Sequence, residues 1–322
     1  MAPTVSIICP TFNGASRGYL KQAIESVLRQ SFESYELFII DDGSTDHTKK
    51  VCEPYLENSR VHYIFQPNGG PASARNTGIS ASTGEFICFL DDDDIWKDEK
   101  LQRQVAFIDA QLSNFSDWGM VFTWVELIDA QGNILGYRGH RQTGSIYKDL
   151  FFGNIIDATS SVLVKREVLN EIGFFDEENI GVEDWDLWLR IAKNYLVFPI
   201  QEYLVKYREH TDRLSSRSEE AFFYENAVLK KALSTAPPEI KPRDVYASFY
   251  INRGVAYFSH GKYRKFRAML IKGARLSPKL VTIENIFLLL ISFLGDKAVG
   301  IIKRTKREIQ KTWIEHKVRE TP

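Results

Sequence analysis

Four consecutive carboxylates, Asp91–Asp94, occupy the centre of the segment FLDDDDIW and directly follow an apolar run. Ionised carboxylates side by side repel one another, so such a cluster is costly unless a cation neutralises it. Hard oxygen ligands suit Mg²⁺ or Mn²⁺, which bind a carboxylate or two and take their other ligands from phosphates and water. A solvated acidic turn is the plain alternative, but the position straight after a predicted buried strand favours a metal site.

A second acidic turn follows another apolar run, in the segment FIIDDGSTD. A carboxylate beside Gly and Ser at a strand end can accept a hydrogen bond from a nucleobase N–H while the backbone stays close to the ligand. A turn with a helix cap accounts for Ser44 and Asp46. It leaves the Asp41-Asp42 pair unexplained, so this turn is a candidate nucleotide site.

The elements that must position these turns are short strands alternating with amphipathic helices. This alternation predicts an α/β fold with a mainly parallel sheet flanked by helices on both faces. In such sheets ligands bind beyond the carboxyl ends of the strands, where both acidic turns fall. The predicted strands are Val5–Cys9, YELFIIDD, VHYIFQPN and GEFICFL, and the predicted helices are Tyr19–Gln30 and Pro71–Ser80.

Five motifs, VSIICPTFN, IIDDGSTD, GGPASARNTGI, FLDDDDIW and VEDWDLWLR, occur in the order and spacing of the family 2 glycosyltransferases. The chain resembles this family from about Val5 to Ser215. The resemblance implies the Rossmann-like GT-A fold and a hexosyltransferase-type enzyme. Such an enzyme would move a sugar, with inversion, from a nucleoside-diphosphate sugar to an acceptor hydroxyl in glycan or polysaccharide biosynthesis, and UDP-sugars are the favoured donors.

The resemblance also implies roles for single residues in donor binding. Pro10 and Phe12 would wall the nucleobase and ribose pocket, and Asp42 would accept a hydrogen bond from the N3–H of a uracil-type base. Arg75 would lie near the base or the diphosphate, and Asp92 would contact the ribose.

Four further residues match the family's metal and catalytic positions. Asp93 would be the direct ligand of Mn²⁺ or Mg²⁺, Asp91 belongs to the same DxD region, and His210 resembles a histidine that closes over the diphosphate or the metal. Asp184 matches the catalytic base. The family often has a small residue at position 92, so the division of labour within the acidic turn stays open.

The chemistry of glycosyl transfer requires these residue types independently. One carboxylate must accept the proton of the acceptor hydroxyl, and a divalent ion must neutralise the leaving diphosphate. Structural alternatives remain at each position: Asp184 as a helix-start charge, Arg75 as a surface ion pair and His210 as a structural residue. Trp185 and Trp188 could pack against a sugar or simply belong to the core.

The C-terminal part of the sequence is basic and its pattern is helical throughout. We therefore predict a GT-A domain over residues 1–218 and a basic helical region over residues 219–322. Tyr246–Ser259 and Tyr263–Leu276 resemble one tetratricopeptide-like helix pair. Ile286–Leu294 is strongly apolar, but nine residues cannot span a bilayer, which needs about 20. This segment, followed by Lys303, Arg304, Lys306 and Arg307, fits either a membrane-surface helix or a core helix on the pair.

Charge is distributed unevenly along a chain whose formal net charge is only −1. From Phe222 onward there are 20 Lys and Arg against 8 Asp and Glu, a net of +12, which leaves −13 for Met1–Ala221. No base-reading motif accompanies the basic part, so we expect no nucleic-acid partner. The expected partners are a nucleotide-sugar donor and a glycan or lipid-linked acceptor.

The expected location is the cytoplasm, or the cytoplasmic face of the membrane as a peripheral protein. Cys9, Cys52 and Cys88 are odd in number and widely spaced, so we expect free thiols, which suit a reducing compartment. The N-terminal segment lacks the basic region and the long apolar region of a signal peptide.

Other functions are less consistent with the sequence. Processive synthases of the cellulose or hyaluronan type carry a QxxRW motif and several transmembrane helices, and this sequence shows neither. A nucleotidyltransferase needs a Gly-rich loop with a basic residue for a triphosphate, which GASRG at Gly14–Gly18 matches poorly. The main alternative is a transferase that loads a lipid-phosphate acceptor at the membrane. A non-catalytic binding module would require that Asp93 or Asp184 be dispensable.

Overall fold

The computed structural model describes residues 3–113, 115–210 and 218–293. The chain divides into two compact units, Met1–Thr235 and Ala236–Pro322. The predicted boundary after residue 218 falls at the first residue of the helix α9 (Ser218–Leu233), whereas this division follows the helix. The reason is that Lys231 of α9 pairs with Asp176 and Asp186 of the first unit, at 2.7 and 3.0 Å.

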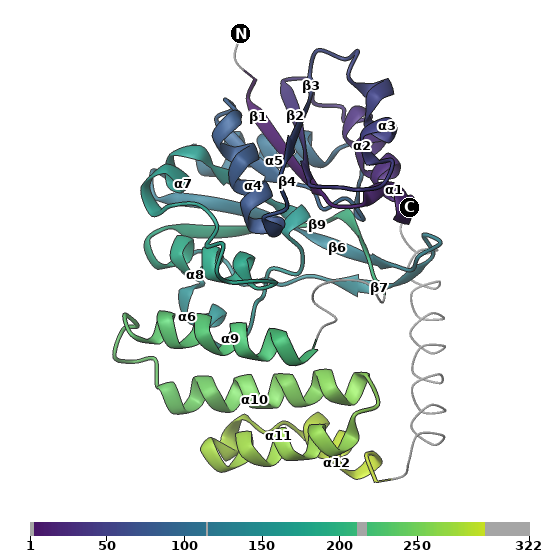
Figure 1. The fold of residues 1–322 in the computed structure, drawn as a ribbon. Helices are drawn as coiled ribbons and strands as arrows, with labels where there is room; N and C mark the ends of the chain where they lie inside the picture. The colour runs from purple at the N-terminus through teal and green to yellow at the C-terminus, as the bar shows by residue number, and fades with distance from the viewer. Residues whose placement is uncertain (1–2, 114, 211–217, 294–322) are drawn as a thin grey trace, which may run out of the picture. The chain divides into compact units, whose positions relative to one another are not determined.

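The first unit is built on one nine-stranded sheet (Figure 1). Its strands are β1 (Val5–Thr11), β2 (Tyr35–Asp42), β3 (Val61–Gln66), β4 (Phe86–Phe89), β5 (Ile95–Trp96), β6 (Trp118–Ile128), β7 (Ile134–Arg138), β8 (Val162–Lys165) and β9 (Leu196–Arg208). They are arranged in the order β3-β2-β1-β4-β8-β6-β9-β5, and β7 pairs with β6.

The first four strands of the chain are parallel, as the alternating pattern predicts. The remainder of the sheet is mixed, because β8 runs antiparallel to both β4 and β6 while β9 runs parallel to β6. The carboxyl ends of β1, β2 and β4 therefore meet at one edge, and both acidic turns lie there. The expected α/β fold, with a sheet that is parallel in its first four strands, is confirmed.

Helices cover both faces of the sheet. Those of the first unit before α9 are α1 (Gly14–Arg17), α2 (Leu20–Leu28), α3 (Thr48–Cys52), η1 (Glu53–Tyr55), α4 (Gly70–Ala81), α5 (Lys100–Phe107), η2 (Ile108–Leu112), α6 (Tyr147–Leu150), η3 (Thr159–Ser161), α7 (Arg166–Ile172) and α8 (Glu183–Asn194).

Alternate residues of β1 and β2 point to opposite faces of the sheet, and each face is covered by a different helix. Ile7 belongs to the core cluster that includes the buried side of α2, whereas Ile8 and Ile40 face α4. A Cβ atom at Gly78 of α4 would lie 2.3 Å from Ile8 Cγ2, so the missing side chain lets this helix approach the sheet closely. The three cysteines are free, as expected, and all three are buried.

The second unit contains the predicted helix pair. Its elements are α10 (Pro242–Ser259), α11 (Tyr263–Leu276), η5 (Pro278–Leu280) and α12 (Ile283–Ile291). α10 begins four residues earlier than predicted, because Pro242 is well suited to the first helical position. Phe258, Phe266, Leu270 and Ile291 are among the buried residues of its core. No described helix is long and apolar enough to cross a bilayer.

Candidate active site

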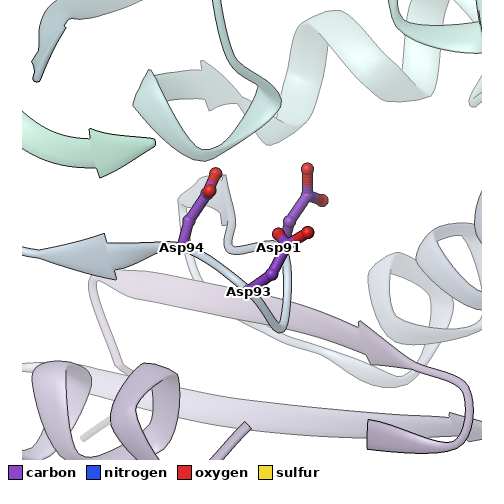
Figure 2. A group of neighbouring side chains, drawn as sticks. All are labelled: Asp91, Asp93 and Asp94. Carbon is purple, nitrogen blue, oxygen red and sulfur yellow. The ribbon is translucent and has the colours of Figure 1, made fainter. Parts of the chain in front are cut away.

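The acidic loop, Asp91–Asp94, connects β4 to β5 and gathers three carboxylates at one point (Figure 2). One oxygen from each of Asp91, Asp93 and Asp94 lies within 4.8 Å of the other two. All three are hard oxygen donors on a single turn, and two of them are buried. The loop therefore fits a divalent cation chemically.

Asp94 is fully buried and fastens the acidic loop to the strands beside it. Its carboxylate accepts hydrogen bonds from Ser160 Oγ at 2.7 Å and from the backbone N–H of Arg208 at 3.0 Å. Ser160 Oγ in turn accepts from the backbone N–H of Asp91 at 3.0 Å. The loop conformation is thus held from η3 and from the end of β9.

The end of β9 also brings His210 to Asp93. His210 Nε2 lies 2.8 Å from Asp93 Oδ2, and both side chains are largely buried. Arg208 Nε donates to the backbone carbonyl of Asp93 at 2.9 Å, which sets the distance between strand and loop. Residues 117 positions apart in the sequence therefore share one site.

Asp92 is part of a different contact network. Its carboxylate accepts from Thr11 Oγ1 at 2.6 Å and from Arg17 Nη2 at 2.8 Å. Burial raises the pKa of Asp92 to about 7, although the Arg17 guanidinium acts in the opposite direction. Arg17 was not predicted from the sequence, where the available signal was a lone basic residue in the short segment after β1, now the helix α1. Phe12, whose carbonyl accepts from Arg17, is 45% exposed at this edge.

Asp42 is held by four N–H groups. Gln66 Nε2 and the backbone N–H of Gly69 donate to Oδ1, while Asn68 Nδ2 and the backbone N–H of Gly70 donate to Oδ2, at 2.8 to 3.1 Å. A carboxylate has about four acceptor positions, so a nucleobase N–H would have to share or replace one of these donors.

Arg75 joins the acidic loop to α8. It donates from Nη2 to Asp91 Oδ1 and from Nη1 to Glu183 Oε1, both at 2.7 Å. Its side chain is 6% exposed and its guanidinium carbon lies 5.3 Å from the centroid of the Phe175 ring. The ion pair considered from the sequence is therefore present, but it is buried rather than on the surface.

Asp184 lies in the first turn of α8, next to Glu183. The backbone N–H of Trp185 donates to its Oδ1 at 2.7 Å, and Asn154 Nδ2 lies 3.3 Å from its Oδ2. Burial, followed by the charge of Glu183, raises the pKa of Asp184 to about 7. A carboxylate with this pKa is well matched to general base catalysis near neutral pH. Asn154 was not foreseen from the sequence.

Pro10 is buried within β1, just before the turn at the site. Trp185 and Trp188 are 6% and 0% exposed, and Trp185 Nε1 donates to the carbonyl of Leu150 at 3.0 Å. Both tryptophans therefore belong to the core, so the structure rules out the alternative that they form an open platform for a sugar ring.

Comparison with known proteins identifies the family. The sequence profile of glycosyl transferase family 2 matches residues 6–173, which is more than half of the chain. The chain belongs to glycosyltransferase family 2. Within this family it is 32% identical over 218 residues to the putative teichuronic acid biosynthesis glycosyltransferase TuaG of Bacillus subtilis, covering 66% of this chain and 82% of TuaG.

The family 2 relatives differ in length. An uncharacterized glycosyltransferase of Methanocaldococcus jannaschii, MJ1057, is 30% identical over 71% of this chain and 79% of its own length. An uncharacterized glycosyltransferase of Rickettsia felis is 33% identical over 67% of this chain, but the match spans only 36% of that relative. The matched part of this chain thus spans only about a third of the length of that relative.

Solved structures share the fold of this family 2 chain. TarS residues 1–349 of S. aureus superpose with a TM-score of 0.59 at 19% identity, covering 98% of this chain and 92% of that one. The mannosyltransferase PcManGT of Pyrobaculum calidifontis, solved with GDP-Man and Mn²⁺, gives a TM-score of 0.58 at 18% identity, covering 99% and 87%. At these identities the likeness concerns the fold.

Proposed function

We propose that this chain is an inverting glycosyltransferase of the hexosyltransferase type. It transfers a sugar from a nucleoside-diphosphate sugar, preferably a UDP-sugar, to an acceptor hydroxyl in glycan or polysaccharide biosynthesis in the cytoplasm. The observation that carries the proposal is the double ion pair of Arg75. It connects Asp91 of the acidic loop with Glu183, the neighbour of Asp184, and so holds the candidate metal site and the candidate base in one rigid arrangement.

Asp184 acts as the general base in this proposal. Its carboxylate accepts the proton of the acceptor hydroxyl as the oxygen attacks the anomeric carbon, and the bond to the diphosphate breaks on the opposite face. Attack opposite the leaving group inverts the configuration. Asn154, 3.3 Å from Oδ2, helps to orient the carboxylate.

Asp93, Asp91 and His210 would hold Mn²⁺ or Mg²⁺. The bound cation would supply charge neutralisation for the leaving diphosphate. Asp94 stabilises the acidic loop through its hydrogen bonds with Ser160 and the backbone N–H of Arg208.

The donor is expected to bind at the turns after β1, β2 and β4. One TarS structure contains UDP-GlcNAc and the PcManGT structure contains GDP-Man, which favours a nucleoside-diphosphate sugar as the ligand class. Phe12 is exposed enough to cover a base, and Pro10 precedes it. Asp42 would exchange the longest of its four contacts, Asn68 Nδ2 at 3.1 Å, for the N–H of the base. Asp92 would meet the ribose together with Arg17.

The experiment that tests the proposal is incubation of the purified chain with radiolabelled UDP-sugars in the presence and absence of Mn²⁺. Transferases hydrolyse their donor slowly without an acceptor, so release of free sugar identifies the donor. Release that requires Mn²⁺ and is abolished by excess UDP supports the proposal. The proposal would be contradicted if no UDP-sugar or GDP-sugar were hydrolysed and none stabilised the protein.

A lipid-phosphate acceptor at the cytoplasmic membrane face is the second candidate for the acceptor. The observation in its favour is the exposed apolar side of α12 in the second unit. An assay with a short-chain lipid phosphate as acceptor, compared with free oligosaccharides, distinguishes the two acceptor classes.

A further inference from the structure

Helix α12 is apolar on two opposite sides. One side contributes Ile291, with Leu288 and Leu289, to the core of the second unit. The other side, which we call the α12 outer face, is exposed. It consists of Ile283, Ile286, Phe287 and Leu290, with exposed fractions of 84%, 47%, 55% and 64%.

The outer face is a stripe rather than a set of scattered side chains. Its residues are spaced by three, one and three positions, which places them on one side of a helix. Phe293, 68% exposed, follows directly after the helix. The capping box formed by Thr282 and Asn285 fixes where the helix begins, so the stripe is presented by an ordered element. The core-helix alternative thus holds for the inner side of α12. The basic residues on which the membrane-surface alternative also rested, Lys303, Arg304, Lys306 and Arg307, lie outside the described residues.

The second unit as a whole is positively charged, and one of its cations lies at the stripe. Residues 236–293 contain ten Lys and Arg but three Asp and Glu, a net formal charge of +7. The guanidinium carbon of Arg267 lies 4.6 Å from the centroid of the Phe293 ring, at one end of the stripe. Helix α11 exposes four further cations, of which Lys265 and Lys272 lie over the rings of Tyr257 and Tyr250 of α10, so they contribute to the charge of the unit rather than to the stripe itself. These cations are Arg264, Lys265, Lys272 and Arg275.

We propose that the α12 outer face docks on an anionic phospholipid surface, with its apolar side chains inserted at the level of the headgroups. Apolar insertion combined with net positive charge is the combination that binds helices to anionic membranes. A second copy of the chain is a poorer occupant, because the same face would bring two surfaces of net positive charge together. This inference goes beyond the transfer reaction, and its test does not depend on that reaction.

The test is co-sedimentation of the full chain with lipid vesicles. Vesicles of phosphatidylcholine alone are compared with vesicles that contain about 30% phosphatidylglycerol, at low salt and in about 0.5 M NaCl. We expect binding to the anionic vesicles and weaker binding at high salt. Failure of the wild-type chain to bind anionic vesicles would overturn the proposal.

A double variant, Phe287→Ser with Leu290→Ser, assigns the binding to the outer face. Vesicle affinity should fall about tenfold or more, because two large side chains no longer leave water. Ile134→Ser is the matched control, since Ile134 is a 51% exposed apolar residue of β7 in the other unit, and its vesicle binding should not change. Equal binding of the double variant and the wild type would contradict the proposal.

Two further readouts separate the rival explanations. Donor hydrolysis by the double variant should equal that of the wild type, because the outer face is not part of the candidate active site. If neither protein hydrolysed a donor, while the wild type bound anionic vesicles and the double variant did not, the proposed function would fail and the membrane proposal would stand. Light scattering after size exclusion reports the oligomeric state. A wild-type dimer that the double variant converts to monomer, without vesicle binding by either, would assign the face to a second copy and refute the membrane proposal.

Discussion

The two units of this chain use charge in opposite ways. Residues 1–235 carry 35 Asp and Glu against 23 Lys and Arg, a net of −12, whereas residues 236–322 carry a net of +11. In the first unit the key carboxylates are buried and matched to specific donors, as Asp42, Asp92 and Asp94 show. The second unit combines a net positive charge with an exposed apolar stripe on α12, and Arg267 lies at the end of that stripe. The difference suggests that one unit is built for preorganised chemistry and the other for contact with a surface.

The largest effect should come from Asp184→Asn. An amide cannot accept the acceptor's proton, so the transfer rate should fall by about 10²–10⁴-fold while donor binding persists. Steady-state transfer and donor-induced thermal shift, measured on the same samples, give the two quantities. Asp98→Asn is a matched control, because Asp98 is half exposed and pairs with Arg29. Transfer at the native rate by Asp184→Asn would show that another group is the base.

Arg75→Met should be the most destabilising of these changes. It leaves Asp91 and Glu183 without the buried cation between them, and removing one partner of a buried ion pair costs about 3–5 kcal/mol in the free energy of unfolding. Arg29→Met breaks an exposed pair of the same type, worth about 1 kcal/mol or less. Urea denaturation of both variants checks the contrast. If Arg75→Met and Arg29→Met lost similar amounts of unfolding free energy, the two ion pairs of Arg75 would not be what holds the acidic loop to α8.

Asp93→Asn should remove the metal-dependent part of donor binding. A donor at about 100 times its dissociation constant stabilises the wild type by roughly 2.7 kcal/mol. In Asp93→Asn, adding Mn²⁺ should no longer increase this stabilisation, whereas Asp98→Asn should respond as the wild type does. Thermal unfolding in the presence of donor, with and without Mn²⁺, measures the metal-dependent part of this stabilisation. An unchanged Mn²⁺ response would remove Asp93 from the metal site.

A smaller effect should appear in the pH dependence of stability. The folded-state pKa of Asp184 is raised to about 7, above the ordinary value of 3.8, so the folded protein binds more protons than the unfolded chain between these values. The wild type therefore loses stability as pH rises from about 4 to 7 on account of this group. Asp184→Asn should gain stability relative to the wild type over that range. Denaturation at pH 5 and pH 8 tests it, and a constant difference would contradict the raised pKa.

Much of the fold was predictable because its determinants are local. Continuous apolar runs marked the buried strands β1 and β2, and helical spacing marked α2 and the α10–α11 pair. The motifs that identify the family are also short contiguous segments, so the acidic loop and the start of α8 could be found without knowing what lies next to them.

Contacts between distant segments were not predictable in the same way. Arg75 and Glu183 are 108 positions apart, and the sequence left Arg75 between a donor contact and a surface pair. The partnership of Asp92 with Arg17, and the burial of Asp94 against Ser160 and Arg208, had no sequence signal that distinguished the four aspartates.

The sequence by itself thus determined the order and type of the elements, the two acidic turns and the family, because periodicity, turn chemistry and motif spacing act over a few residues. Only the tertiary structure decided which side chain meets which. Strand order across the sheet placed His210 beside Asp93. Helix packing in the second unit buried one apolar side of α12 and left the other exposed. Both outcomes depend on contacts among elements far apart in the chain, where local patterns carry no information.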